Sequence, residues 1–198
     1  MSSFDMRIFI ALDIDEAIRD RIARFLDGVR GFAPDARWVR PESLHVTLKF
    51  IGETAPENVG QIKEKLKAVE ANAIEMNIRG SGFFPGAKSP RVFWLGIEAG
   101  PSLAELASTV DDRVAALGIA KEDHPFSPHL TLARGGGSAG SPRSKSDGFK
   151  PSFQRLQEKL AALPVPEFGT MTAREFFLYQ SHLSRGGSRY EKLASFTL

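Results

Sequence analysis

The sequence predicts an α+β fold made of two pseudo-symmetric lobes, each an antiparallel sheet with helices packed outside, around a central cleft. Strand-like and helix-like patterns interleave along the 198 residues. Several strands follow one another too closely for the crossover that a parallel pair needs, so a doubly wound parallel sheet is the less favoured alternative. A short polar motif also occurs twice, which predicts two related halves within a single bilobal domain spanning residues 1–198.

The repeated motif has the pattern Pro-x-Ser-x-His-x-Thr-Leu and occupies residues 41–48 and 125–132. Its histidines, His45 and His129, are 84 residues apart. At that spacing, an ungapped comparison of the two halves gives ten identities over 42 positions. The identities outside the motif include the pairs Arg7 and Arg91, Phe9 and Phe93, and Asp27 and Asp111.

Hydrophobic periodicity assigns the elements of both halves. The run MRIFIALD alternates and is rich in branched and aromatic side chains, as in a strand, and residues 15–30 place Ile18 and Ile22 on one helical face. Strands are expected at 6–13, 43–52, 74–84, 90–98, 127–133, 172–181 and 189–198. Helices are expected at 15–30, from Pro56 onward, at 101–117 and near 151–162. The internal repeat is therefore expected over approximately 7–52 and 91–136.

The composition excludes several classes of site. The chain has no cysteine, so it forms neither a disulfide framework nor a thiolate nucleophile or metal ligand. Its longest apolar runs are far shorter than the roughly 20 residues of a membrane helix, and the N-terminal run is too short for a signal peptide. We therefore expect a cytoplasmic protein without membrane partners. The net charge of +2 and the pI of about 9.0 permit a polyanionic partner without establishing one.

Strand parity predicts what the two motifs present, because side chains alternate between the faces of a strand. In 43–50, one face is expected to carry Leu44, Val46, Leu48 and Phe50, and the other Ser43, His45, Thr47 and Lys49. In 127–133, His129 and Thr131 share a face opposite Leu130 and Leu132. If the two halves are related by a two-fold axis, the histidines and threonines of both motifs line one cleft.

Two imidazoles in one cleft suit acid/base catalysis of in-line displacement at phosphorus. Imidazole titrates near pH 6.5, so one ring can accept a proton from water while the other donates one to the leaving oxygen. The hydroxyls of Thr47 and Thr131 can donate to phosphoryl oxygens. Lys49 and Arg134 are the nearest cationic residues in the sequence. Arg134 has the wrong parity for the cleft, so a bulge or the strand end would have to redirect it.

Other interpretations stay open on the residues alone. A single His-x-Thr pair in a strand is commonly structural, and a zinc site would need a third ligand beyond the motifs, with His124 and His182 as the remaining histidines. The Gly/Ser-rich run at 135–148 is expected to be a flexible surface loop whose basic residues are solvated. The aromatic residues near the motifs are assigned to the core, with stacking of one of them on a base as the alternative: Phe9, Phe83, Phe84, Phe93 and Trp94.

The paired motifs, about 80 residues apart in a chain of this length, resemble those of the two-histidine (2H) phosphoesterases. Within that superfamily the chain resembles the LigT-like RNA 2′,3′-cyclic phosphodiesterases, also known as the 2′-5′ RNA ligase family. The resemblance covers RIFIALDID near the start, HVTLKFIGE, PRVFWLGI, HLTLAR and the C-terminal tail. The Gly/Ser-rich stretch at 135–148 departs from the family pattern because it is longer and looser.

The resemblance implies metal-independent opening of a 2′,3′-cyclic phosphate to a 2′-phosphomonoester, without a cofactor. On that resemblance His45 is the proton donor to the departing 3′ oxygen and His129 the proton acceptor that activates water. Thr47, Thr131 and Arg134 would bind the substrate phosphate. The expected partners are RNA with 2′,3′-cyclic phosphate ends or small cyclic nucleotides, and a monomer is expected.

Three alternatives use the same fold. The site could run toward joining, as a 2′-5′ RNA ligase, although hydrolysis should dominate unless the cleft excludes water. The protein could be a non-catalytic RNA-end binding module, which the presence of both histidines and both threonines argues against. Its substrate could also be another cyclic phosphate, such as one on an ADP-ribose derivative.

Overall fold

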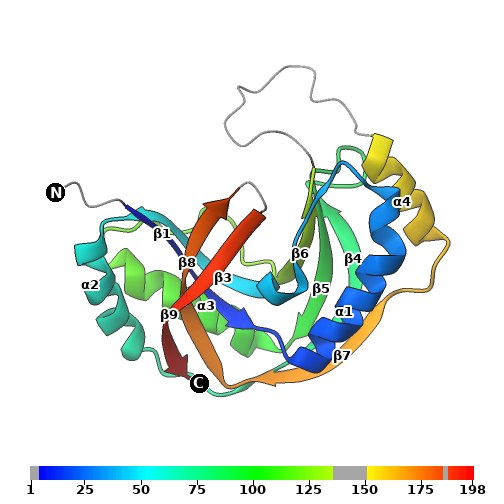
Figure 1. Cartoon of the computed structure of the whole chain (residues 1–198). Coiled ribbons are helices and arrows are strands. Elements are labelled where there is room, and N and C mark those ends of the chain that lie inside the picture. The colour runs from blue at the N-terminus through cyan, green and yellow to red at the C-terminus, as the bar shows by residue number, and fades with distance from the viewer. Residues whose placement is uncertain (1–4, 136–150, 185–186) are drawn as a thin grey trace.

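The strands of the protein form two antiparallel sheets (Figure 1). The computed structural model describes residues 5–135, 151–184 and 187–198. Sheet A has the strand order β3-β1-β8-β9, and sheet B has the order β2-β6-β5-β4-β7. Every strand pair in the described part of the chain is antiparallel, which confirms the α+β class and rules out the doubly wound parallel sheet.

The elements follow the expected order with a few additions. The strands are β1 (Met6–Asp13), β2 (Arg37–Trp38), β3 (His45–Thr54), β4 (Ile74–Phe84), β5 (Val92–Ala99), β6 (His129–Arg134), β7 (Glu167–Ala173), β8 (Glu175–Ser184) and β9 (Gly187–Thr197). The helices are α1 (Glu16–Val29), α2 (Pro56–Lys67), α3 (Pro101–Ala115) and α4 (Pro151–Ala161), with 3₁₀ turns η1 (Arg30–Phe32) and η2 (Pro41–Ser43). Pro56 and Pro101 open their helices at a position where a missing N–H costs nothing.

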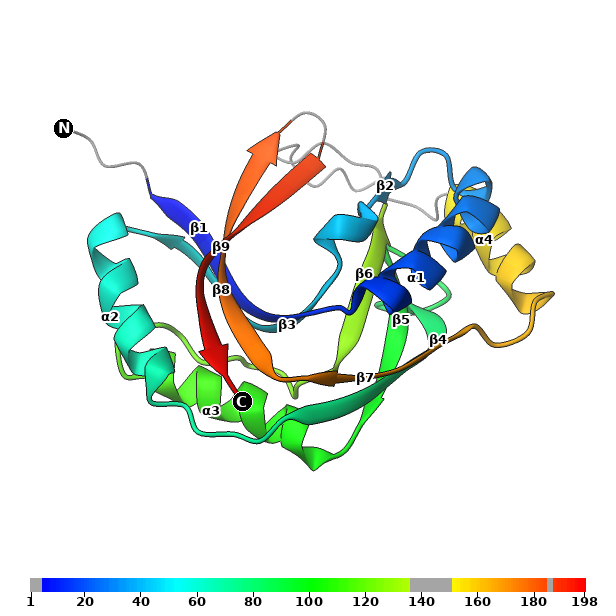
Figure 2. The same cartoon turned by 60° about the horizontal axis from the view of Figure 1, so that its bottom comes forward.

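The helices cover the outer faces of the sheets and are exchanged between the two halves of the chain (Figure 2). Helix α1 follows β1 of sheet A but packs on sheet B, where Arg21 Nη1 donates to the Phe168 carbonyl at 2.7 Å. The Phe25 ring meets the Phe168 ring edge-on, with centroids 5.4 Å apart. Helix α3 follows β5 of sheet B but contacts β3 and α2 on the side of sheet A. Each sheet therefore depends on a helix from the other half.

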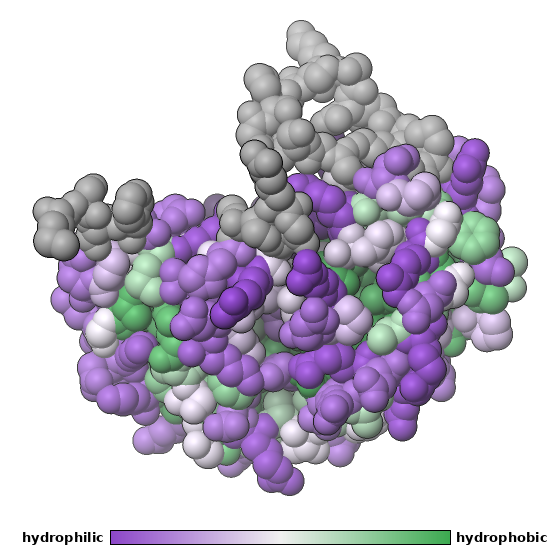
Figure 3. All heavy atoms as spheres, viewed as in Figure 1, coloured by the Kyte–Doolittle hydropathy of each residue, from purple (hydrophilic) through white to green (hydrophobic). Residues whose placement is uncertain are grey.

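Each sheet buries the face that carries helices and leaves an inner face turned away from them. In β1, Ile8 and Ile10 belong to a core cluster that joins both sheets, whereas Phe9 lies on the inner face of sheet A in a smaller cluster. That smaller cluster consists of Phe9, Ala11, Phe177 and Tyr179. On the face shown in Figure 3, hydrophilic side chains predominate and apolar ones appear between them. The inner faces carry no helices, so they are the faces on which side chains can reach a ligand.

One strand was expected with the wrong bounds, and one short strand was not expected. Instead of one strand at 172–181, the chain forms β7 in sheet B and, after Arg174, β8 in sheet A. The alternation changes phase at this crossing, since Met171 and Ala173 are buried before it and Phe176 and Leu178 after it. Strand β2 was not anticipated because two residues are too few for a periodic pattern.

The spacing of 84 residues does not hold throughout the two halves. This spacing relates β3 to β6. The spacing that relates β1 to β5 is one residue shorter, because Ala11 pairs with Thr47 and Trp94 pairs with Thr131. Phe9 and Phe93, which the sequence matches, therefore occupy different places: Phe9 on the inner face and Phe93 in the main core. The bounds of the repeat stay a prediction.

The loop expected at 135–148 falls, from residue 136 on, outside the described residues. In the described part of the chain, no helix is both long and apolar enough to cross a membrane.

Candidate active site

The two motif histidines are held in the same way. His45 begins β3 directly after η2, and its Nδ1 lies 2.8 Å from the carbonyl oxygen of Ser43. His129 begins β6, and its Nδ1 lies 2.7 Å from the carbonyl oxygen of Ser127. A carbonyl only accepts, so each Nδ1 must carry the proton and donate it. In both rings Nε2 is therefore the nitrogen that exchanges protons with a ligand.

The two motifs meet where the sheets approach each other, at β3 and β6. Burial is the largest influence on His45 and lowers its pKa below the ordinary value of 6.5, while the hydrogen bond to Ser43 acts in the opposite direction. The charges of Arg134 and His129 lower this pKa further, and that of Asp13 raises it. The pKa of His45 thus depends on the charges of His129 and Arg134 of β6, as expected for side chains that share one cleft.

Thr47 and Thr131 follow the histidines on the same inner faces, as strand parity predicts. Thr47 pairs with Ala11 of sheet A, and Thr131 pairs with Trp94 of sheet B. Both side chains are half-buried, and neither hydroxyl hydrogen-bonds any residue that the structure describes. Two hydroxyl donors are consequently available to a ligand beside the two imidazoles.

A bulge follows the threonine in both strands. The extra residue is Leu48 in β3 and Leu132 in β6, which are counterparts at the spacing of 84. One extra residue shifts the alternation of the remaining strand by one position. Arg134 accordingly pairs with Val92 and lies on the inner face with Thr131. The redirection that Arg134 needed to reach the cleft is therefore present.

The same bulge overturns the placement of Lys49 on the cleft face. Lys49 is only 3% exposed, and its Nζ donates to the Ala120 carbonyl at 2.7 Å. The ammonium group also forms ion pairs with Asp111 at 2.7 Å and Glu122 at 3.1 Å. Phe50, expected in the core, is instead 46% exposed. Simple alternation failed here because it did not anticipate the extra residue at Leu48.

Aromatic rings surround His45 on the inner face of sheet A. The Phe9 centroid lies 4.7 Å from the imidazole centroid, and the Tyr190 ring meets the imidazole nearly perpendicularly at 5.0 Å. The Tyr179 ring stacks on Phe9 at 5.2 Å. Burial is also the main reason why the pKa of Tyr179 lies well above its ordinary value of 10, with Asp13 adding to the effect. These rings supply the burial that disfavours the charged form of His45.

Sheet B supports His129 in a similar manner. The Phe84 ring meets the imidazole edge-on at 5.0 Å, and Phe84 stacks on Trp94 at 5.1 Å. Trp94 lies flat against Gly82, where a Cβ would come within 2.6 Å of Cη2 of the indole. Phe83 and Phe93 pack on each other away from the cleft. Phe9 is 3% exposed, so of these rings Phe84 and Trp94 remain as candidates for stacking on a base.

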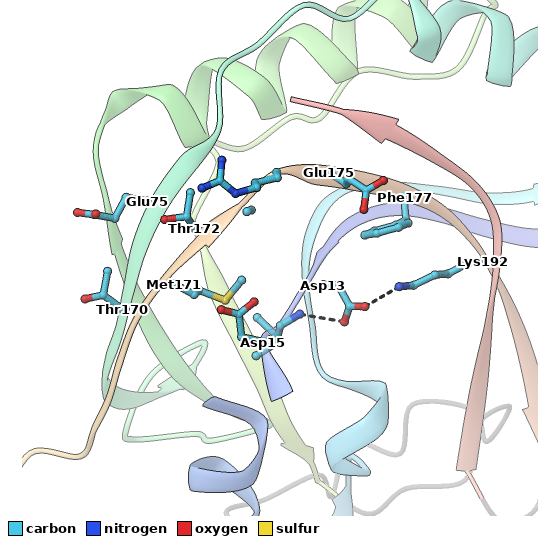
Figure 4. A pocket seen from close by; sticks show the side chains of 12 residues that line it. Asp13, Asp15, Glu75, Thr170, Met171, Thr172, Glu175, Phe177 and Lys192 are labelled. Atoms are coloured by element: carbon cyan, nitrogen blue, oxygen red, sulfur yellow. Dashed lines mark hydrogen bonds and ion pairs between the residues drawn. The ribbon is translucent and has the colours of Figure 1, made fainter. Parts of the chain in front are cut away.

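A pocket of about 810 Å³ lies beside Asp13, at the end of β1 (Figure 4). Asp13 connects it to the motif, because it lines the pocket and pairs with His45 in the strand register. The Asp13 carboxylate accepts from Lys192 Nζ at 2.6 Å and from Arg19 Nη2 at 2.7 Å. The charged residues of the lining are Asp13, Asp15, Glu75, Glu175, Arg174 and Lys192.

The remaining histidines lie apart from this arrangement. His182 Nε2 lies 3.0 Å from a carboxylate oxygen of Glu191, and His124 is exposed before β6. Among residues 5–135, 151–184 and 187–198, no three His, Cys, Asp or Glu side chains gather as a metal ion would require.

A family model described as LigT like Phosphoesterase matches residues 12–94 and again residues 95–190. The chain belongs to the LigT-like phosphoesterases. An RNA 2′,3′-cyclic phosphodiesterase of Archaeoglobus fulgidus is 33% identical over 191 residues, which are 96% of this chain and 99% of the relative. The RNA 2′,3′-cyclic phosphodiesterase of Escherichia coli K12 is 28% identical, with 97% of this chain and 96% of the relative covered.

Solved structures agree with this membership. The crystal structure of E. coli LigT complexed with 3′-AMP superposes with a TM-score of 0.76 at 27% identity and covers 98% of both chains. The crystal structure of a protein of Thermus thermophilus gives a TM-score of 0.75 at 28% identity, again with 98% of both chains. The two-lobed α+β architecture expected from the sequence is thereby confirmed.

Several residues around the candidate site of this LigT-like phosphoesterase escaped sequence reasoning. Asp13 and Tyr190 lie beside His45 but come from strands distant in the sequence. Arg37 lies on β2, opposite Arg134 of β6. No local pattern marks these positions, since they depend on which strands pair. Only the parity of β1 offered a signal, because it places Asp13 on the same face as Phe9.

Proposed function

We propose that this phosphoesterase hydrolyses RNA 2′,3′-cyclic phosphodiester ends to 2′-phosphomonoesters by metal-independent acid/base catalysis at His45 and His129. The observation that carries the proposal is the matched pair of Nδ1-to-carbonyl hydrogen bonds, at 2.8 Å and 2.7 Å, which leaves an Nε2 in each half for proton transfer. Family membership and the relatives named RNA 2′,3′-cyclic phosphodiesterase support the substrate class.

The reaction divides into one proton accepted and one proton donated. His129 Nε2 takes a proton from water, and the water oxygen bonds to phosphorus. The bond between phosphorus and the 3′ oxygen breaks, and protonated His45 donates its Nε2 proton to that oxygen, which leaves a 3′ hydroxyl and a 2′-phosphomonoester. Thr47 and Thr131 donate hydrogen bonds to the non-bridging oxygens, and Arg134 adds a positive charge on the same face.

To act as the proton donor, His45 must be protonated, although its pKa is lowered in the free protein. A bound phosphodiester carries a negative charge, which favours the protonated imidazole and opposes the effect of Arg134. Asp13, whose charge raises the pKa of His45, acts in the same direction as the substrate. Protonation of His45 is therefore coupled to substrate binding.

The test combines product identification with substitution of both histidines. A short RNA ending in a 2′,3′-cyclic phosphate is incubated with the protein, and the product phosphate is located by phosphorus NMR. His45→Ala and His129→Ala should each lower turnover by about 10²–10⁴-fold, whereas His182→Ala, a histidine outside the cleft, serves as the matched control. Circular dichroism checks that all variants fold.

Other products identify the alternatives. Joined RNA ends in place of a 2′-phosphate would identify a ligase, and tight binding without turnover would identify a binding module. Undiminished turnover in either motif variant, or loss of turnover on adding a chelator, would exclude the metal-independent two-histidine mechanism. A cyclic phosphate on an ADP-ribose derivative belongs in the same substrate panel.

A further inference from the structure

Two arginines face each other at the edge of sheet B. Arg37 of β2 pairs with Arg134 of β6 in the antiparallel register, and Figure 2 shows β2 beside β6 at this edge. Directly opposed residues of an antiparallel pair point to the same face, and like charges in that position destabilise the pair. Both side chains are exposed, and neither is ion-paired to a carboxylate among the described residues. The described part of the chain thus pairs two arginines in register without an ion-paired carboxylate at either one.

Their shared face is the face of the catalytic motif. Arg134 pairs with Val92 and Thr131 with Trp94, so the two arginines lie on the inner face beside Thr131. Those partners are two positions apart in β5, which corresponds to about 7 Å along a strand. A ligand phosphate at Thr131 would therefore have the arginine pair within one nucleotide's reach.

Strand β2 is short but firmly attached. Trp38 Nε1 donates to the Ala33 carbonyl at 3.0 Å, and its ring meets Phe93 edge-on at 6.0 Å. The backbone N–H of Val39 donates to the Leu132 carbonyl at 2.8 Å. Arg37 is consequently held in register with Arg134 by its neighbours, and its position does not depend on its own side chain.

The pocket beside Asp13 is less suited to a polyanion. It is lined by four carboxylates, Asp13, Asp15, Glu75 and Glu175, against the two cations Arg174 and Lys192. Asp13 is ion-paired to Lys192 and Arg19, but the other three carboxylates have no such pair among the described residues. A nucleic-acid backbone is attracted to positive charge and repelled by negative charge. The phosphates of a bound RNA are therefore better accommodated at the arginine pair than in that pocket.

We propose that Arg37 binds the phosphate on the 5′ side of the terminal nucleotide of the substrate, beside Arg134, whose charge also serves the phosphate at Thr131. The guanidinium fork suits phosphate oxygens, and a bound phosphate would offset the repulsion between the two arginines. The site consequently prefers RNA ends, or nucleotides with a 5′ phosphate, to cyclic mononucleotides with a free 5′ hydroxyl. This subsite rests on the proposed function for its biological meaning, but its ligand chemistry can be tested separately.

The test measures binding of two ligands that cannot be turned over: adenosine 2′-monophosphate and adenosine 2′,5′-bisphosphate. Isothermal titration calorimetry should give at least about tenfold tighter binding of the bisphosphate, the size expected of charge-assisted hydrogen bonds. In Arg37→Gln this ratio should fall toward 1, and in Arg37→Lys it should be intermediate. Arg113→Gln, on the outer helix α3, is the matched control and should keep the ratio of the unchanged protein.

A ratio near 1 in the unchanged protein, or an undiminished ratio in Arg37→Gln, would overturn the proposed subsite. Arg37→Gln should also have a Tm at or above that of the unchanged protein, because it removes a like-charge pair. A clear fall in Tm would mean that Arg37 supports the fold, which contradicts the proposal. Since neither ligand is hydrolysed, absence of phosphodiesterase activity would count against the proposed function alone.

Discussion

Lys49 lies four residues after His45, yet its ammonium group forms a 2.7 Å ion pair with Asp111 of α3, on the face of sheet A opposite to the cleft. Burial alone would lower the pKa of Lys49, but the hydrogen bonds to Asp111 and Glu122 outweigh it and raise the pKa above the ordinary 10.5. The lysine also donates to the Ala120 carbonyl, in the segment that leads to His129. One side chain thereby links the strand of the first motif to the segment that precedes the second motif.

Replacing Lys49 by methionine should destabilise the protein. The Asp111 side chain is only 16% exposed, so removal of its partner leaves a poorly solvated carboxylate. Breaking such a pair costs about 3 kcal/mol, which in a chain of this size lowers Tm by roughly 6–12 °C. Differential scanning calorimetry measures the change.

A paired substitution separates the lost charge from the lost packing. In Lys49→Met combined with Asp111→Leu, no buried carboxylate is left alone, so most of the lost stability should return. If the double variant is as unstable as Lys49→Met, the ion pair is not the source of the effect. Turnover of the double variant then reports whether the link to the His129 segment matters for catalysis.

The pKa of His45 should move in opposite directions when its two charged neighbours are neutralised. Arg134 lowers this pKa and Asp13 raises it, so Arg134→Gln should raise the pKa and Asp13→Asn should lower it. Proton NMR titration of the imidazole is practicable because the chain has four histidines. A shift of the same sign in both variants would contradict the arrangement of charges around His45.

The expected shift in the pKa of His45 also predicts a shift in the pH dependence of kcat/KM. A proton donor is lost as the pH rises through its pKa, and kcat/KM reports the free enzyme. The alkaline limb of kcat/KM assigned to His45 should therefore move to higher pH in Arg134→Gln, in parallel with the NMR value.

Both threonines should matter for turnover rather than for folding. Thr47→Val and Thr131→Val keep the shape of a strand residue but remove the hydroxyl, which has no described protein partner to lose. Each should lower kcat by up to about 10²-fold, at the low end of the loss seen for one transition-state donor. Steady-state kinetics and Tm measured together test this, and a large loss of Tm at normal kcat would argue against a catalytic role.

Gly82 should tolerate no side chain. In Gly82→Ala the new methyl group would displace the Trp94 ring, at a cost of about 1–3 kcal/mol. Because Phe84 stacks on Trp94 and borders His129, kcat should fall as well. Gly60→Ala is the control: nothing lies within 4 Å of its added Cβ in α2, so stability should rise by about 0.5–1 kcal/mol. Equal Tm in both variants would refute the packing argument.

Much of the site followed from local sequence because its parts are local. The alternation of Leu44, Val46 and Leu48 fixes the face of His45, and the motif residues hold their own imidazoles through carbonyls two positions earlier. The same reasoning failed one residue beyond each threonine, where the bulges reverse the alternation. A bulge depends on the partner strand, so the sequence of β3 alone does not predict it.

For the fold too, features set by neighbouring residues were predictable, whereas features set by contacts between distant residues were not. Long strands and amphipathic helices were predictable from periodicity, whereas the crossing at Arg174 changes the phase between two sheets and was read as one strand. Arg37 illustrates the consequence for function. Its place opposite Arg134 arises from the pairing of β2 with β6, and that pairing is decided by the tertiary structure.

The exchange of helices between the halves bears on how the protein unfolds. β1 pairs with both β3 and β8, so sheet A joins the first strands of the chain to its last, while α1 serves sheet B. Unfolding of either sheet would remove packing partners from the other sheet. This favours a single cooperative unfolding transition. A chain cut between β4 and β5 should yield two fragments that stay unstructured apart and regain structure, and with it the paired histidines, only when mixed.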